Sequence, residues 1–206
     1  MRVILGAAIA ISLLGGLGAW SVHRTATAKV AVGTHPGGVG LGKTLNELRP
    51  AAGDSMIGFS SGCFWGAEEA FRKVPGVVAT AVGYTGGSSS FPSYELAHRT
   101  GHLETVLVEF SPKRTPLDAL LKVFWTLPRS RNPEASSKSS YRATIWTYDS
   151  DESTQASNSR ENLQKSLHHN LAVNILPARP FYIAEQFHQQ YDEKSGKDLC
   201  FAKGDL

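Results

Sequence analysis

Strand patterns and helix patterns alternate along this chain from Met56 onward, and glycine or proline ends most of them. A short apolar run reads as a strand, and helical spacing of apolar residues then continues from Phe64 until Pro75 and Gly76 stop the helix. The predicted strands are residues 56–59, 77–84, 105–110, 142–148 and 171–176, and the predicted helices are residues 64–74, 116–125, 151–168 and 182–191. Strands and helices intermixed in this way predict an α+β fold.

The predicted architecture is a two-layer sandwich with a central mixed sheet, ferredoxin-like in type. The chain of 206 residues has room for one domain, and its 41% hydrophobic residues allow a real core. Charged residues make up 19% and aromatic residues 9%, which excludes wholesale disorder, a collagen, a coiled coil and a multi-span membrane protein. The formal net charge of +3 gives no electrostatic reason to expect a nucleic-acid partner.

An apolar run without charge, residues 3–20, follows Arg2 at the start of the chain. This pattern is typical of a secretory signal or an N-terminal membrane anchor, and a buried core helix stays open as a third interpretation. We expect residues 1–28 to be the signal or anchor, residues 29–54 a glycine-rich linker, and residues 55–206 the globular domain. Either export route places the domain in an oxidising compartment, periplasmic or cell-envelope, where it is released after cleavage or anchored by its N-terminus.

Cys63 stands between the first predicted strand and the first turn of the first predicted helix, in the pentapeptide Gly-Cys-Phe-Trp-Gly. A cysteine in that position faces the positive end of the helix dipole and free backbone N–H groups, which stabilise a thiolate. The flanking Gly62 and Gly66 leave access to the sulfur. Position alone is equally consistent with an inert, buried cysteine, so both interpretations stay open at this point.

Seven short motifs appear in order along the globular part of the chain. They are Gly-Cys-Phe-Trp-Gly (62–66), Gly-Tyr-Thr-Gly-Gly (83–87), Pro-x-Tyr (92–94), Thr-Gly-His-Leu-Glu (100–104), Leu-Leu-x-x-Phe-Trp (120–125), Tyr-Arg (141–142) and His-Gln-Gln-Tyr (188–191). Together they resemble the signature of the A-type peptide methionine sulfoxide reductases, which reduce the S epimer of methionine sulfoxide. The resemblance covers about residues 56–200 and implies an enzyme that repairs oxidised proteins.

The resemblance implies a catalytic role for Cys63 and for Glu104. The Cys63 thiolate attacks the sulfoxide sulfur, methionine leaves, and Cys63 becomes a sulfenic acid. The sulfoxide oxygen needs a proton as the S–O bond breaks, and Glu104, at the start of the predicted strand 105–110, is the candidate acid. Burial beside aromatic rings would raise the pKa of Glu104 and hold its carboxyl protonated.

The same resemblance implies a substrate pocket made of aromatic side chains. The hydroxyls of Tyr94 and Tyr141 donate hydrogen bonds to the sulfoxide oxygen, and Phe64 and Trp65 hold the S-methyl group of the substrate. Core packing is the second interpretation of Phe64, which falls on the apolar stripe of its helix. His102 and His188 are expected to be structural, and we expect no metal site.

Cys200 is expected to complete the cycle as a resolving cysteine on a mobile C-terminal tail. It lies nine residues after Tyr191, as in the family, and Cys63 and Cys200 are the only cysteines of the chain. Its attack on the sulfenic acid would give a Cys63–Cys200 disulfide, which thioredoxin or a thioredoxin-like dithiol then reduces. We expect no bound cofactor and a monomer. A static structural disulfide is the alternative interpretation.

One segment, residues 127–140, departs from the family pattern. It is shorter than in the family, and an Asp that helps to line the family's site has no counterpart, since Ser136 stands at its place and Ser140 replaces a Gln. Glu134 is the nearest acidic residue. We therefore expect a weaker or differently selective enzyme, with a catalytically weakened binding module as the alternative. A thioredoxin-type oxidoreductase is excluded because the chain has no Cys-x-x-Cys motif.

Overall fold

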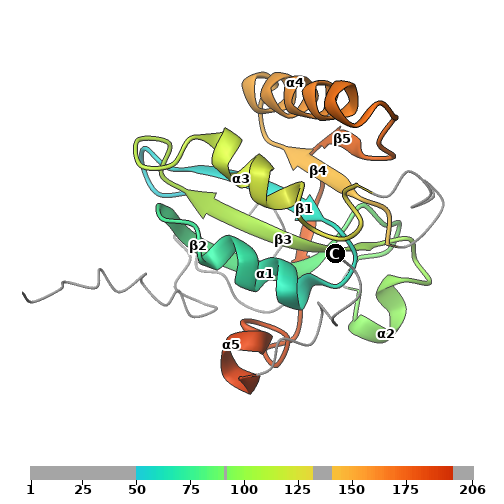
Figure 1. The fold of residues 1–206 in the computed structure, drawn as a ribbon. Coiled ribbons are helices and arrows are strands. Elements are labelled where there is room, and N and C mark those ends of the chain that lie inside the picture. Colours follow the sequence, from blue (N-terminus) through green and yellow to red (C-terminus); the bar gives the residue numbers. More distant parts are fainter. Residues whose placement is uncertain (1–49, 91, 132–140, 197–206) are drawn as a thin grey trace, which may run out of the picture.

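The computed structural model describes residues 50–90, 92–131 and 141–196. The strands are β1 (Ser55–Ser60), β2 (Val77–Thr85), β3 (Leu103–Phe110), β4 (Thr144–Thr147), β5 (Asn174–Pro177) and β6 (Phe181–Ile183). The helices are α1 (Phe64–Arg72), α2 (Tyr94–Ala97), α3 (Leu117–Phe124), α4 (Ser150–Leu167) and α5 (Tyr191–Ser195). The predicted α+β class is confirmed (Figure 1).

All six strands belong to one sheet, in the order β5-β4-β1-β3-β2-β6. Every neighbouring pair is antiparallel except β4 and β5, which are parallel. The prediction of a mixed sheet is therefore confirmed. The long strands β2 and β3 lie next to each other near the middle, and β3 is buried along its whole length. Glu104, the second residue of β3, pairs with Tyr84 of β2.

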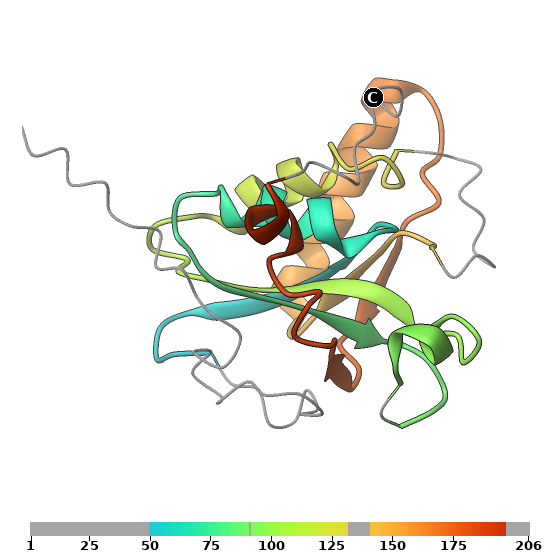
Figure 2. The same ribbon diagram turned by 90° about the horizontal axis from the view of Figure 1, so that it is seen from below.

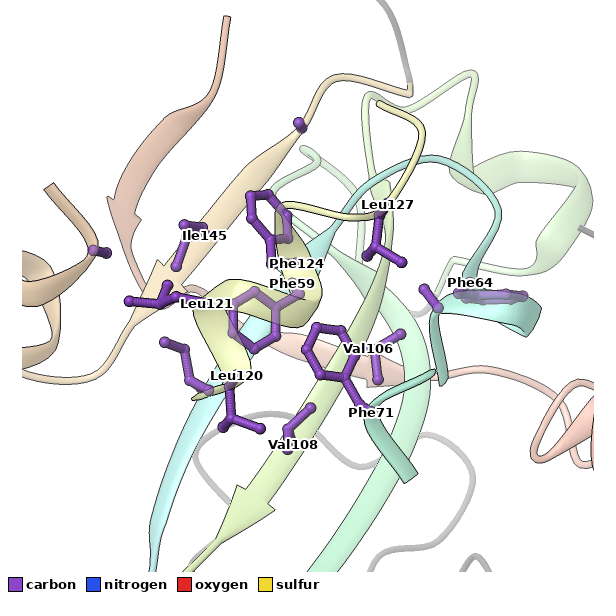
Figure 3. Packing of buried hydrophobic residues seen from close by; sticks show 14 of the residues in the cluster. Phe59, Phe64, Phe71, Val106, Val108, Leu120, Leu121, Phe124, Leu127 and Ile145 are labelled. Atoms are coloured by element: carbon purple, nitrogen blue, oxygen red, sulfur yellow. The ribbon is translucent and has the colours of Figure 1, made fainter. Parts of the chain in front are cut away.

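Helices α1, α3 and α4 cover one face of the sheet, as the two perpendicular views in Figures 1 and 2 show. The core between these helices and the sheet centres on Phe59 of β1, whose ring stacks on Phe71 of α1 at 4.5 Å and on Phe124 of α3 at 5.4 Å between ring centroids. Figure 3 shows these rings packed together, with Phe64 at one end of the cluster. A second, smaller cluster lies on the opposite face of the sheet and consists of Met56, Ala81, Leu107, Phe181 and Ile183.

The helix boundaries follow from local chemistry that the sequence carries. Helix α1 ends just before Pro75 and Gly76, as predicted, because proline cannot continue a helix. The Asp149 side chain caps α4 by accepting a hydrogen bond of 2.8 Å from the Glu152 N–H. Helix α4 buries only Glu152 and Ala156, which confirms the predicted polar and exposed helix.

The predicted helix over residues 182–191 is wrong. Phe181–Ile183 instead forms the edge strand β6, which pairs with the last three residues of β2. The segment after it is held in turns by the Gln189 side chain, which accepts a hydrogen bond from the Val82 N–H and donates to the carbonyls of Val82 and Ala184. The helical pattern was misleading because pairing with a distant strand overrode local propensity.

Smaller differences concern element ends. The predicted strand 142–148 is reduced to Thr144–Thr147, and the predicted strand 171–176 starts only at Asn174. Strand β3 starts two residues earlier than predicted, so Glu104 lies inside it. Among the residues that the structure describes, no helix is long and apolar enough to cross a membrane. The predicted signal or anchor lies outside these residues, as does nearly all of the predicted linker.

Glu68 joins α1 to two other parts of the fold through a fully buried carboxyl group. It accepts hydrogen bonds from the Thr80 hydroxyl (2.9 Å) and from the Gln190 N–H (2.6 Å). Burial raises the pKa of Glu68 to about 7, and these hydrogen bonds and the nearby Arg72 only partly oppose this effect. Glu68 therefore connects α1, β2 and the residue before α5 through a carboxyl that is partly protonated at neutral pH.

This burial predicts a pH dependence of stability that Glu68→Gln removes. The folded protein keeps the Glu68 proton between the ordinary pKa of 4.5 and about 7, whereas the unfolded chain releases it, so stability falls as the pH rises through that window. The Gln variant should lack roughly 2 kcal/mol of the fall in the free energy of unfolding between pH 5 and pH 7, measured by urea unfolding. Glu69→Gln, at the neighbouring partly exposed residue, is the control. An equal fall in Glu68→Gln and wild type contradicts the prediction.

Candidate active site

Cys63 is the N-cap residue of α1. It follows a short turn, residues 61–62, that comes directly after β1. Its backbone is extended (ψ 127°), while the preceding Gly62 has a φ of +85°, a conformation that favours glycine. A Cβ on Gly62 would also lie 3.2 Å from Cγ of Arg129, which packs against this turn. The strand–turn–helix position predicted for Cys63 is confirmed. Cys63 is half-buried and is held in a disulfide.

The Glu104 carboxyl lies against the start of α1. Its Oε2 accepts a hydrogen bond of 3.1 Å from the N–H of Phe64, the residue after Cys63. Its side chain is only 4% exposed, and burial raises the pKa of Glu104 to about 7 although the Phe64 N–H opposes this shift. The predicted effect of burial on this pKa is confirmed. At neutral pH the carboxyl is thus present in both its acid and its charged form, beside the cysteine.

His98 connects the acid to the two predicted tyrosines. Its Nε2 lies 3.3 Å from Oε1 of Glu104 and 3.5 Å from the Tyr141 hydroxyl. Its ring packs on the Tyr141 ring at 5.0 Å and meets the Tyr94 ring edge-on at 6.3 Å, both between ring centroids. His98 lies in none of the motifs that predicted the site. One signal was available: His98 follows Tyr94 by four residues, which brings two side chains together if the segment is helical.

Trp65 forms an aromatic wall with residues from the C-terminal part of the chain. Its Nε1–H donates a 3.0 Å hydrogen bond to Nδ1 of His188, and its ring stacks on Tyr191 with 3.9 Å between centroids. His188 also lies against the rings of Phe64 (5.2 Å) and Tyr94 (4.7 Å). Burial lowers the pKa of His188, which favours the neutral ring that accepts from Trp65. These contacts fit the structural role predicted for His188.

Glu185 holds the start of α2 in place and was also missed. Its carboxylate accepts hydrogen bonds from the Tyr84 hydroxyl (2.8 Å) and from the Tyr94 N–H (3.0 Å). Although burial favours the neutral form, these hydrogen bonds and the nearby His188 keep the pKa of Glu185 below its ordinary value. Glu185 follows β6 in the segment that was wrongly predicted as a helix, so its contact with α2 could not be foreseen.

The structure brings six predicted site residues together. Phe64, Trp65, Tyr94, Glu104 and Tyr141 are joined by contacts that run through His98 and His188, and Cys63 is the residue directly before Phe64. Cys200 lies outside the described residues, as do Glu134, Ser136 and Ser140 of the segment that departs from the family pattern. His102 is buried and its Nδ1 lies 2.8 Å from the Thr100 hydroxyl. Within the described part of the chain, His, Cys, Asp and Glu form no group of three or more that could hold a metal ion.

Comparison with known proteins gives one consistent family. The family model described as peptide methionine sulfoxide reductase matches residues 55–205. Peptide methionine sulfoxide reductase A2 of Arabidopsis thaliana is 41% identical over 155 residues, which cover 71% of this chain and 70% of the plant protein. Peptide methionine sulfoxide reductase MsrA of Methanosarcina acetivorans is 42% identical over 156 residues, which cover 71% of this chain and 82% of the archaeal protein.

The fold agrees with a solved structure of the same kind. Methionine sulfoxide reductase A of Corynebacterium diphtheriae matches with a TM-score of 0.63 at 30% sequence identity, over 74% of this chain and 80% of that protein.

Proposed function

The chain belongs to the peptide methionine sulfoxide reductase family, and on this premise we propose that Cys63 and Glu104 reduce methionine-S-sulfoxide in oxidised proteins to methionine. The observation that carries the proposal is the hydrogen bond of 3.1 Å between the Glu104 carboxyl and the Phe64 N–H. It holds an acid with a pKa of about 7 beside the cysteine at the N-terminus of α1. The same chemistry applies to free methionine sulfoxide, which we include as a second substrate in the proposal.

In the first step the Cys63 thiolate attacks the sulfoxide sulfur and Glu104 gives its proton to the sulfoxide oxygen. The bond formed between the two sulfur atoms and the S–O bond then both break as the protonated oxygen passes to Cys63. Methionine leaves as the thioether and Cys63 becomes a sulfenic acid, so the cysteine sulfur is oxidised and the substrate sulfur is reduced. The N-terminus of α1 favours the thiolate through its dipole and its free N–H groups. Two acid–base groups with opposite requirements, an anionic sulfur and a neutral carboxyl, thus lie side by side.

The aromatic side chains around these groups supply the substrate site. Tyr94 and Tyr141, which both contact His98, direct their hydroxyls to the sulfoxide oxygen. Phe64 and Trp65 hold the S-methyl group by contact area and by the attraction between sulfur and aromatic rings. The hydrogen bond of Trp65 to His188 fixes the indole ring, which keeps the methyl site preformed.

In the second step the Cys200 thiol attacks the Cys63 sulfenic acid, releasing water and forming a disulfide. Cys63 is disulfide-bonded and the chain has one other cysteine, which supports this pairing. An external dithiol, thioredoxin or a thioredoxin-like protein, then takes up the oxidising equivalents by thiol–disulfide exchange and becomes a disulfide itself. No resident cofactor or metal has a part in this cycle.

The finer predictions of fold and location are part of the same proposal. The order β4-β1-β3-β2, with α1 after β1 and α3 after β3, supports a two-layer sandwich of ferredoxin-like type. The apolar residues 3–20 support export to the periplasm or cell envelope, by a cleaved signal or a retained anchor. We propose a monomer that meets a membrane only through this segment, if it is retained.

A catalytically weakened binding module remains the alternative function. Its only support is the departure of residues 127–140 from the family pattern. The hydrogen bond from the Phe64 N–H to Glu104 favours the enzyme, because a binding module has no need of a buried acid at the helix start that Cys63 caps.

Cys63→Ser should abolish the reduction of a dabsyl-labelled methionine-S-sulfoxide peptide with dithiothreitol as reductant. A serine hydroxyl does not ionise at neutral pH, so no nucleophile replaces the thiolate. Product is measured by separating the labelled peptides. The methionine-R-sulfoxide peptide is the substrate control for wild type, and the unfolding transition under reducing conditions is the control for folding. Measurable turnover by folded Cys63→Ser would refute the proposed nucleophile.

Glu104→Gln should slow the release of methionine in a single turnover by about 10²- to 10⁴-fold, the usual effect of a positioned acid. Since the pKa of Glu104 is about 7, the wild-type rate should decline above about pH 7, and this decline should be absent in the variant. Glu109→Gln is the matched control, because Glu109 is also buried on β3 and burial also raises its pKa. An unchanged rate in Glu104→Gln removes Glu104 as the acid.

Cys200→Ser separates an enzyme cycle from a structural disulfide. Pre-reduced Cys200→Ser should release about one methionine per protein in a burst and then stop with thioredoxin as reductant, because the sulfenic acid has no resolving thiol. Dithiothreitol reaches the sulfenic acid directly and should restore part of the turnover.

A structural disulfide predicts a different result for the same variant. Loss of such a disulfide typically costs roughly 2–5 kcal/mol of stability and gives no burst. The melting temperature is therefore compared with that of oxidised wild type, in which the disulfide is intact. Normal cycling of Cys200→Ser with thioredoxin, or a large drop in its melting temperature, contradicts the resolving role.

A further inference from the structure

His98 occupies the place where three functional groups of the site meet. Its Nε2 lies 3.3 Å from the Glu104 carboxyl and 3.5 Å from the Tyr141 hydroxyl, and the Tyr94 ring lies edge-on to the imidazole. None of the family motifs identified in the sequence contains His98. It lies at the C-terminal cap of the short helix α2, whose first N–H is tied to Glu185. The fold therefore supports this imidazole from both its own helix and the segment after β6.

The surroundings of Nδ1 and Nε2 of His98 indicate which of the two nitrogens carries the proton when the imidazole is neutral. Nδ1 of His98 is buried and has no hydrogen-bond partner within the described part of the chain. A buried N–H without an acceptor is rarer in proteins than an unsatisfied acceptor. The proton is therefore assigned to Nε2, which lies 3.3 Å from Oε1 of Glu104 and 3.5 Å from the Tyr141 hydroxyl. From there the N–H is within donating distance of the Glu104 carboxyl.

We propose that His98 is a positioning residue whose Nε2–H stabilises the Glu104 carboxylate that forms when Glu104 gives its proton to the sulfoxide oxygen. This inference rests on the proposed function. In the step, the proton moves from Glu104 to the oxygen, the oxygen passes to the Cys63 sulfur, and His98 keeps its own proton. The developing negative charge then has two donors, the Phe64 N–H on Oε2 and His98 on Oε1.

The burial of the acid makes such a donor necessary. The Glu104 side chain is 4% exposed, so water cannot solvate the carboxylate, and an unpaired buried charge is costly. The His98 side chain is 27% exposed, which keeps the imidazole in exchange with solvent between turnovers. The other titratable or charged groups around Glu104 and His98 come from several elements. They are Tyr84 of β2, which pairs with Glu104 in the sheet, Cys63 at the start of α1, Tyr94, Tyr141 and Arg129, whose guanidinium carbon lies 5.4 Å from the centre of the Tyr141 ring.

The test compares His98→Ala with His98→Gln in single-turnover reduction of the methionine-S-sulfoxide peptide. His98→Ala should slow methionine release by about 10- to 100-fold, the range for losing a hydrogen bond to a charged group, with little change in the peptide concentration at half-maximal rate. His98→Gln keeps an N–H at a similar distance from the backbone and should recover most of this loss. His169→Ala, at an exposed histidine on the turn after α4, is the control.

The pH profile provides a readout that a purely structural role would not move. Removing a donor to the charged form raises the pKa of a carboxyl, so the decline in rate on the basic side should shift upward by about one pH unit in His98→Ala. The shift should be smaller in His98→Gln. The same upward shift should appear in the carboxyl titration of Glu104, followed by carbon NMR in the absence of substrate.

Two results would overturn the inference while leaving the proposed function intact. One is a wild-type rate and pH profile in His98→Ala, and the other is a slower rate with an unmoved profile in both His98 variants. If His98→Ala does not fold, the profile and titration of His98→Gln decide alone: no upward shift there overturns the inference. Turnover by Cys63→Ser would instead refute the proposed function, whatever the His98 variants do.

Discussion

The hydrogen bond between the buried Glu104 carboxyl and the Phe64 N–H is the contact on which the rest of the site depends. A helix begins with N–H groups that have no partner inside the helix, and a buried carboxyl needs donors, so each group satisfies the other. Strands β1 and β3 are antiparallel, and Phe59 pairs with Val106. This register places the last residues of β1 beside the first residues of β3, at one end of the two strands. The turn that carries Cys63 is therefore fixed next to the acid by sheet register and helix capping together.

The parts of this arrangement that the sequence predicted are those with local causes. The turn at Cys63 and the ends of α1 follow from spacing, glycine and proline over a few residues. The burial of Glu104 was expected only from the family resemblance, because its position in the chain is equally open to a solvated carboxylate. Strand β6 and His98 were missed because their positions depend on distant partners. The three residues of β6 form a strand only because they pair with β2. The start of α2 is held by Glu185, which lies 91 residues after Tyr94 in the sequence.

Some residues of the family motifs belong to the candidate active site, whereas others only permit close packing around it. A Cβ on Gly87 would overlap the ring of His102, and one on Gly86, whose φ is +83°, would lie 2.7 Å from the Trp146 ring. Gly86 and Gly87 therefore permit the rings of Trp146 and His102 to pack closely against the backbone of this motif. His102 belongs to this packing, since Thr100 holds its ring in place. A motif match alone does not separate His102 from Glu104, and both are buried. Their contacts do separate them, since His102 meets Thr100 whereas Glu104 accepts from the Phe64 N–H beside Cys63.

The same reasoning connects the aromatic wall to the resolving step. Tyr191, the first residue of α5, stacks on Trp65, which is two residues from Cys63, so the C-terminal segment is anchored beside the nucleophile. Cys200 follows Gly196 by four positions, and a chain of that length spans at most roughly 14 Å. In the proposed cycle, anchoring the C-terminal segment on Trp65 would limit the distance that the Cys200 thiol has to cover to reach a Cys63 sulfenic acid. The contact between Trp65 and Tyr191 would thus serve both proposed steps, because the same stacking also shapes the aromatic wall.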